Sequence, residues 1–155
     1  MRHILFFILA LLLGMPAVAQ DSLRHEVLFE TNKGNIRIAL YNETPLHRDN
    51  FLKNVREGLY DGLLFHRVIS KFMIQTGDTA SRHAQPLGET AETYTVPAEF
   101  RCPKIYHKRG AVAAAREGDA DNPERNSSMC QFYIVYGIRY SDAMLDRTQQ
   151  KLDVA

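Results

Sequence analysis

The sequence has no long hydrophobic run and no excess of charge of either sign. Its longest apolar run, residues 4–13, has ten residues, whereas a membrane-spanning helix needs ~20. Lysine and arginine total 19 and aspartate and glutamate 18. No basic stripe indicates nucleic acid, and no polybasic patch indicates a membrane surface. We therefore expect neither a nucleic-acid partner nor a stable membrane anchor.

Cysteine is scarce, and its two positions leave two interpretations open. Cys102 and Cys130 are the cysteines of the chain. An oxidising compartment would permit them to pair, but their spacing shows neither the geometry nor the need for a disulfide, so two buried free thiols are the alternative. The histidines show no metal-ligand spacing. No metal or other cofactor is expected.

The N-terminus has the pattern of an export signal. Arg2 and His3 precede the apolar run of residues 4–13, and the small residues 17–19 (Ala-Val-Ala) suit a signal peptidase. The sequence therefore predicts a signal peptide at residues 1–19 and a mature domain at residues 20–155. The predicted mature domain begins at Gln20, and the predicted location is the bacterial periplasm.

The first part of the mature domain predicts a β-hairpin followed by a helix. Residues 25–30 and 35–41 alternate apolar and polar side chains around the turn-forming residues 31–34. Thr44 and Pro45 then suit the start of a helix, with Thr44 as its N-cap, and Gly58 suits its end.

The second part predicts further strands and one short helix. Residues 79–93 are polar and predict a long loop, whereas residues 110–115 and 131–136 predict strands. Residues 116–129 are charged and rich in turn-forming residues. Residues 141–152 have helical spacing, but so short a helix is marginal without a partner surface.

Residues 65–78 are the most informative segment. They read F-H-R-V-I-S-K-F-M-I-Q-T-G-D and predict two strands with a bend near Ser70 and Lys71. Arg67 is costly in such surroundings unless its guanidinium has a partner. The segment resembles the signature of cyclophilin-type peptidyl-prolyl cis-trans isomerases nearly residue for residue. The hairpin, the helix and the later strands follow in that family's order.

The resemblance implies a mainly β fold, a cyclophilin-like antiparallel β-barrel with a capping helix. The family's final strands and second helix do not occur before Ala155, so we expect the barrel to be incomplete at its C-terminus. The implied function is peptidyl-prolyl cis-trans isomerisation, assisting the folding of exported proteins, with proline-containing polypeptides as partners. Two alternatives are a proline-peptide binding module without turnover and an inactive fragment that is poorly soluble because its sheet edges are open.

The resemblance also places the site residues. Arg67 would donate to the prolyl nitrogen, because a guanidinium keeps its protons, although an isolated arginine would suggest a surface ion pair. Gln75 would hold that guanidinium or bind the substrate backbone. Tyr133 stands where the family usually has a pocket phenylalanine. The other predicted substrate-binding residues are Phe72, Met73, Ala115, Arg116 and Gln131.

Overall fold

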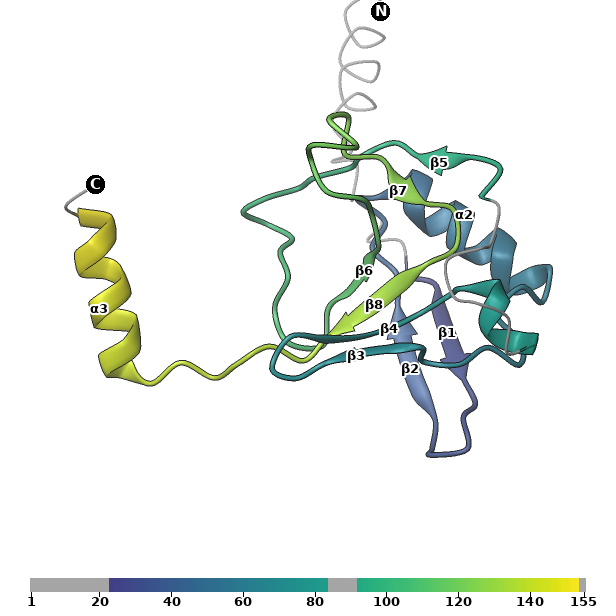
Figure 1. Ribbon diagram of the computed structural model, residues 1–155, viewed down its shortest axis with the longest axis horizontal. Helices are drawn as coiled ribbons and strands as arrows, with labels where there is room; N and C mark the ends of the chain where they lie inside the picture. Colours follow the sequence, from purple (N-terminus) through teal and green to yellow (C-terminus); the bar gives the residue numbers. More distant parts are fainter. Residues whose placement is uncertain (1–22, 84–91, 154–155) are drawn as a thin grey trace, which may run out of the picture.

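The computed structural model describes residues 23–83 and 92–153 (Figure 1). The predicted signal peptide and the predicted first mature residue, Gln20, lie outside these residues. In chain order the elements are β1 (Glu26–Phe29), β2 (Ile36–Ala39), α2 (Pro45–Arg56), β3 (Arg67–Ile69), β4 (Met73–Thr76), the 3-10 helix η1 (Thr79–His83), β5 (Thr95–Val96), β6 (Val112–Ala114), β7 (Ser127–Ser128), β8 (Phe132–Val135) and α3 (Asp142–Asp153).

The strands of the described residues pair in an antiparallel manner and form three sheets. Strands β1 and β2 form the predicted hairpin, β5 pairs with β7, and the largest sheet has the order β3-β4-β8-β6. The mainly β, antiparallel fold class predicted from the sequence is confirmed, although the three sheets are not joined into one closed barrel within the described residues. The four-stranded sheet is the element that positions the site.

The strands predicted from alternating apolar and polar residues agree with the structure in the hairpin. In the hairpin, Val27 pairs with Ile38, and both are buried. Two segments differ from the prediction. Residues 79–83 of the predicted loop form the 3-10 helix η1, and the turn-rich stretch 116–129 contains β7. Strand β7 forms because its two serines pair with β5, a long-range contact that local composition does not reveal.

Helix α2 begins at Pro45 as predicted, but its cap comes from elsewhere in the chain. Thr44 makes no side-chain capping hydrogen bond. Instead the backbone N–H groups of Leu46 and His47 donate to the Glu99 carboxylate at 3.2 and 2.9 Å. Burial alone would raise the pKa of Glu99, but hydrogen bonds from the His47 ring and from these two N–H groups outweigh it and lower this pKa. Glu99 thus supplies the capping acceptor.

The core lies between α2, the hairpin and β8. Phe29, Phe51, Tyr60 and Phe132 form an aromatic cluster with ring centroids 5.2–6.3 Å apart. Asn54 is 1% exposed, and its Nδ2 donates to the Met129 carbonyl at 2.7 Å. This buried amide ties α2 to the segment just before β8, so the helix fixes the chain that enters the site.

Helix α3 stands away from the rest of the domain at the end of an extended segment (Figure 1). None of its described residues is buried, and Met144, Leu145 and Leu152 are exposed. Neither α2 nor α3 is long and apolar enough to cross a membrane.

Candidate functional site

One cavity of about 650 Å³ contains every residue that the sequence analysis selected. It lies over the four-stranded sheet and the loops at the ends of β5, β6 and β7. The predicted residues in its lining are Arg67, Phe72, Met73, Gln75, Ala115, Arg116, Gln131 and Tyr133. The fold thus brings together residues that are up to 66 positions apart, between Arg67 and Tyr133.

A chain of hydrogen bonds crosses the floor of the cavity. Arg67 and Gln75 are cross-strand partners in β3 and β4. The Arg67 guanidinium donates to the Gln75 carboxamide oxygen at 3.1 Å, and the Gln75 nitrogen donates to Gln131 Oε1 at 2.9 Å. Arg67 is exposed, whereas Gln75 is only 8% exposed. The guanidinium therefore keeps donors for a ligand while a buried amide fixes its position.

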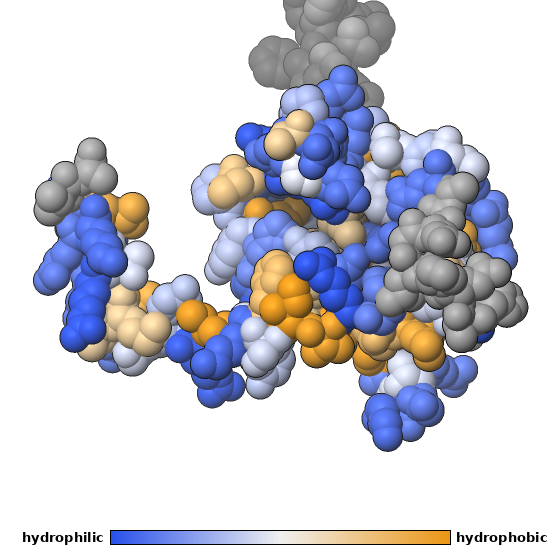
Figure 2. Space-filling model, in the orientation of Figure 1, coloured by the Kyte–Doolittle hydropathy of each residue, from blue (hydrophilic) through white to orange (hydrophobic). Residues whose placement is uncertain are grey.

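Apolar side chains form the wall beside Arg67. Lys71 has a positive φ of 62° between β3 and β4, which provides the bend expected near Ser70 and Lys71. This turn places the Phe72 ring 6.0 Å from the Tyr133 ring. Met73 also lines the cavity and is 2% exposed, while Phe72 is 48% exposed. Figure 2 shows hydrophobic surface near β3 and β4 among mostly hydrophilic surroundings.

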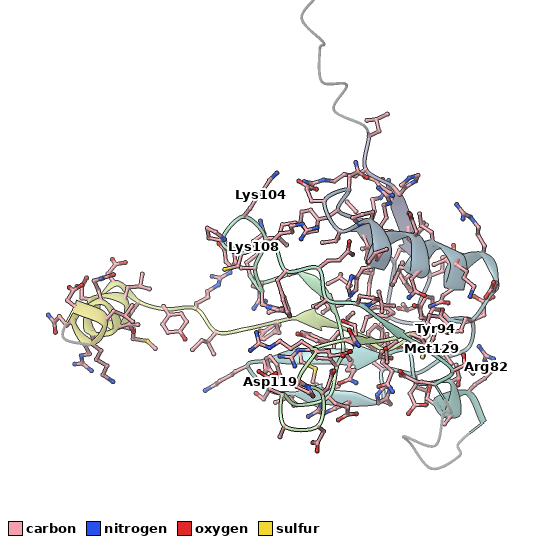
Figure 3. The ribbon with its side chains drawn as sticks, turned by 90° about the horizontal axis from the view of Figure 1, so that it is seen from above. Arg82, Tyr94, Lys104, Lys108, Asp119 and Met129 are labelled. Carbon is pink, nitrogen blue, oxygen red and sulfur yellow. The ribbon has the colours of Figure 1, made fainter. Side chains whose placement is uncertain are left out.

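The opposite side of the cavity is the end of β6. The Ala115 N–H donates to the Gln131 carbonyl at 2.9 Å, and the Ala115 carbonyl accepts from Ser128 N–H at 2.8 Å. The Ala115 N–H is therefore already used inside the fold. The Arg116 guanidinium donates to Asp119 at 2.6 Å. That hydrogen bond lowers the pKa of Asp119, which is labelled in Figure 3.

Sequence reasoning missed the polar rim of the cavity. Glu92, Thr95, Asn122, Asn126 and Ser128 also line it. The Ser128 hydroxyl donates to the Glu92 carboxylate, and Met129 N–H donates to the same carboxylate at 3.3 Å. Thr95 and Ser128 belong to the two-residue strands β5 and β7, and the other three residues lie in loops. None of these segments has a recognisable motif, so no local signal identified them.

A second cluster, His47, Glu99 and Ser127, has the order of groups found in serine hydrolases. The His47 ring contacts Glu99 Oε2 at 2.8 Å through Nδ1 and Ser127 Oγ at 3.1 Å through Nε2. Ser127, however, is 7% exposed, and Glu99 already caps α2. A nucleophile must be reached by its substrate. The arrangement therefore joins α2 to the β5–β7 pair and does not indicate hydrolysis.

The structure describes both cysteines as free thiols. Cys102 is exposed, which differs from the alternative of two buried thiols, and Cys130 is buried. Burial, with a further contribution from the Glu92 charge, raises the pKa of the Cys130 thiol to about 11, so it is protonated at neutral pH. Among residues 23–83 and 92–153, no group of three His, Cys, Asp or Glu side chains could hold a metal ion.

Comparisons with known proteins show which proteins this chain resembles. The model of the family described as "Cyclophilin type peptidyl-prolyl cis-trans isomerase/CLD" matches residues 26–149. The spliceosome-associated protein CWC27 homolog of Danio rerio is 37% identical over 113 residues, covering 72% of this chain and 22% of that protein. The chain thus spans less than a quarter of that relative's length.

Solved structures give the same fold. A cyclophilin type peptidyl-prolyl cis-trans isomerase of Cryptosporidium parvum is 29% identical, with a TM-score of 0.60, over 74% of this chain and 68% of that chain. Its crystal structure in the presence of the dipeptide Ala-Pro has 24% identity and a TM-score of 0.58, over 79% of this chain and 84% of that one.

Proposed function

This chain belongs to the cyclophilin-type peptidyl-prolyl cis-trans isomerase family, and on that premise we propose that it catalyses the cis-trans isomerisation of peptide bonds that precede proline. The observation that carries the proposal is the Arg67 guanidinium, exposed in the cavity and held by Gln75 at 3.1 Å. Beside it lies the apolar wall of Phe72, Met73 and Tyr133.

The chemistry needs a pocket and a donor rather than a nucleophile. An X-Pro bond resists rotation because the amide nitrogen shares its lone pair with the carbonyl, which gives a barrier of ~18–20 kcal/mol. As the bond twists, the prolyl nitrogen becomes pyramidal and basic. A donor held at that nitrogen binds the twisted bond better than either planar isomer and therefore lowers the barrier.

The cavity offers each of these parts. The proline ring would pack against Phe72, Met73 and Tyr133, which line the cavity together, and the exposed Arg67 would donate to the prolyl nitrogen. The Ala115 N–H is hydrogen-bonded to Gln131 and is not free to bind a peptide. The backbone of Arg116 would therefore make most of the main-chain hydrogen bonds to the peptide. No step of this mechanism requires a metal or an organic cofactor.

The proposal is tested by following a short Ala-Pro peptide by exchange NMR with and without catalytic amounts of the protein. We expect the cis and trans signals to exchange faster in its presence, since uncatalysed exchange takes tens to hundreds of seconds. Peptide binding without faster exchange, by protein shown to be folded, would favour the binding-module alternative and contradict the proposal.

We propose further that the protein acts on exported polypeptides in the bacterial periplasm. The support is the Ala-Val-Ala sequence at residues 17–19 after a ten-residue apolar run. We expect the protein recovered from a periplasmic extract to begin at Gln20, as measured by mass spectrometry of the intact chain. An unprocessed N-terminus at Met1 in that extract would contradict this proposal.

A further inference from the structure

His107 contacts Tyr133, one residue of the apolar wall, but does not itself line the cavity. Its Nε2 lies 3.0 Å from the Tyr133 hydroxyl, and the two rings are nearly parallel, 11° apart, with centroids separated by 5.9 Å. His107 is exposed and does not line the cavity itself. It is also absent from the segment 65–78 that carried the family resemblance.

The Tyr133 ring depends on contacts at its outer end. Its partners across the sheet are Ala113 in β6 and Gln75 in β4. A methyl group cannot hold the far end of an aromatic ring, and the Gln75 amide is engaged by Arg67 and Gln131. Phe72 contacts the ring but is itself 48% exposed. Within residues 23–83 and 92–153, the hydrogen bond made by the Tyr133 hydroxyl is the one to His107. Burial raises the pKa of this hydroxyl, and the Arg116 charge acts on it in the opposite direction.

The loop that carries His107 is itself fixed to the sheet. Gly110 N–H donates to the Val135 carbonyl of β8 at 2.8 Å, and Ala111 N–H donates to the Lys108 carbonyl at 2.9 Å. Lys104 and Lys108, labelled in Figure 3, mark this loop on one side of the domain. The loop is thus tied to β8, the strand that contains Tyr133, three residues after His107.

We propose that His107 is a positioning residue of the proline pocket, which orients the Tyr133 ring through its hydroxyl. The inference rests on the proposed function, because it assigns Tyr133 to the surface that receives the proline ring. A phenylalanine in place of Tyr133 would not need this contact, whereas a tyrosine hydroxyl needs a hydrogen-bond partner, which His107 supplies at 3.0 Å. His107 and Tyr133 therefore act as one unit.

The test is a double-mutant cycle on peptide binding. His107→Ala should raise the Kd for an Ala-Pro peptide about five-fold, which corresponds to the net free energy of one ordinary hydrogen bond. In a Tyr133→Phe background, His107→Ala should have no further effect, because the hydroxyl that it positions is gone. His107→Asn retains a side chain that can bond a hydroxyl and should restore part of the affinity. His25→Ala, which removes another exposed histidine, is the matched control.

Turnover in the same variants separates this inference from the proposed function. We expect His107→Ala to raise KM and to leave kcat nearly unchanged, because Arg67 is untouched. If the unaltered protein binds the peptide without speeding exchange, the proposed function fails, while the Kd cycle still decides the role of His107. Equal losses from His107→Ala with and without the Tyr133 hydroxyl, or no loss in either, would overturn the inference.

Discussion

Replacing Arg67 by alanine is expected to slow the catalysed exchange of an X-Pro peptide by ~10²-fold or more, about 2.7 kcal/mol of lost transition-state stabilisation. The reason is the position of the guanidinium, which is an exposed donor in the cavity that Phe72 and Tyr133 also line. The Arg116 guanidinium, by contrast, is engaged by Asp119. Peptide affinity should largely survive because the apolar wall remains. The measurement is exchange NMR on a short peptide, with the Kd determined in parallel.

The Arg67 variant should also fold. The side chain of Arg67 is exposed. Its removal deletes the hydrogen bond to the Gln75 oxygen but leaves the hydrogen bond from the Gln75 nitrogen to Gln131 in place. Arg37→Ala is a suitable control, since Arg37 is an exposed β-strand arginine that pairs with Glu26 in the hairpin at 2.9 Å and does not line the cavity. An Arg67→Ala protein that folds correctly and exchanges the peptide at the original rate would remove Arg67 from the mechanism.

Replacing Gly77 by alanine is expected to destabilise the protein by more than about 3 kcal/mol. Gly77 has φ +99°, a region that L side chains rarely adopt. A Cβ atom there would lie 2.3 Å from the Cys130 carbonyl oxygen and 2.7 Å from Gln131 Cα. These are backbone atoms that cannot rotate away, so β4 and the chain entering β8 would have to separate. Urea denaturation measures the loss.

Gly110→Ala separates the two causes of this effect. Gly110 also has a positive φ, +83°, but nothing lies within 4 Å of its added Cβ. It should therefore show backbone strain alone, about 1–2 kcal/mol. If Gly77→Ala proved as mild as Gly110→Ala, the close approach of β4 to the chain at Gln131 would not matter to stability.

The sequence predicted the strands that have a strong local pattern. In residues 65–78 the apolar residues around Arg67 predicted two strands. A bend between the two strands was predicted because Phe72 could not otherwise join Met73 and Gln75 on one face. The resemblance then suggested that Gln75 could hold the guanidinium. The structure has β3 and β4 with Arg67 opposite Gln75. Alternation and turn-forming residues act over a few positions, so such segments are readable from the chain alone.

Features that depend on distant parts of the chain could not be predicted in this way. Thr44 has the right type and position for a cap, yet Glu99 makes the capping hydrogen bonds. Ser127 and Ser128 pair with β5 although serine does not favour strands. His107 reaches Tyr133 across 26 positions of sequence. In each case a contact with a distant part of the chain determines the local structure, and the neighbouring residues in the sequence do not reveal that contact.

The capping of α2 by Glu99 also has a consequence for the order in which the chain folds. The hydrogen bonds from Leu46 and His47 to Glu99 span 53 and 52 positions, and the contact from His47 to Ser127 spans 80. Closing loops of that length costs chain entropy before any contact is gained. A twelve-residue helix is marginal by itself. Helix α2 and the β5–β7 pair should therefore become ordered in one cooperative step, late rather than as an early helical nucleus.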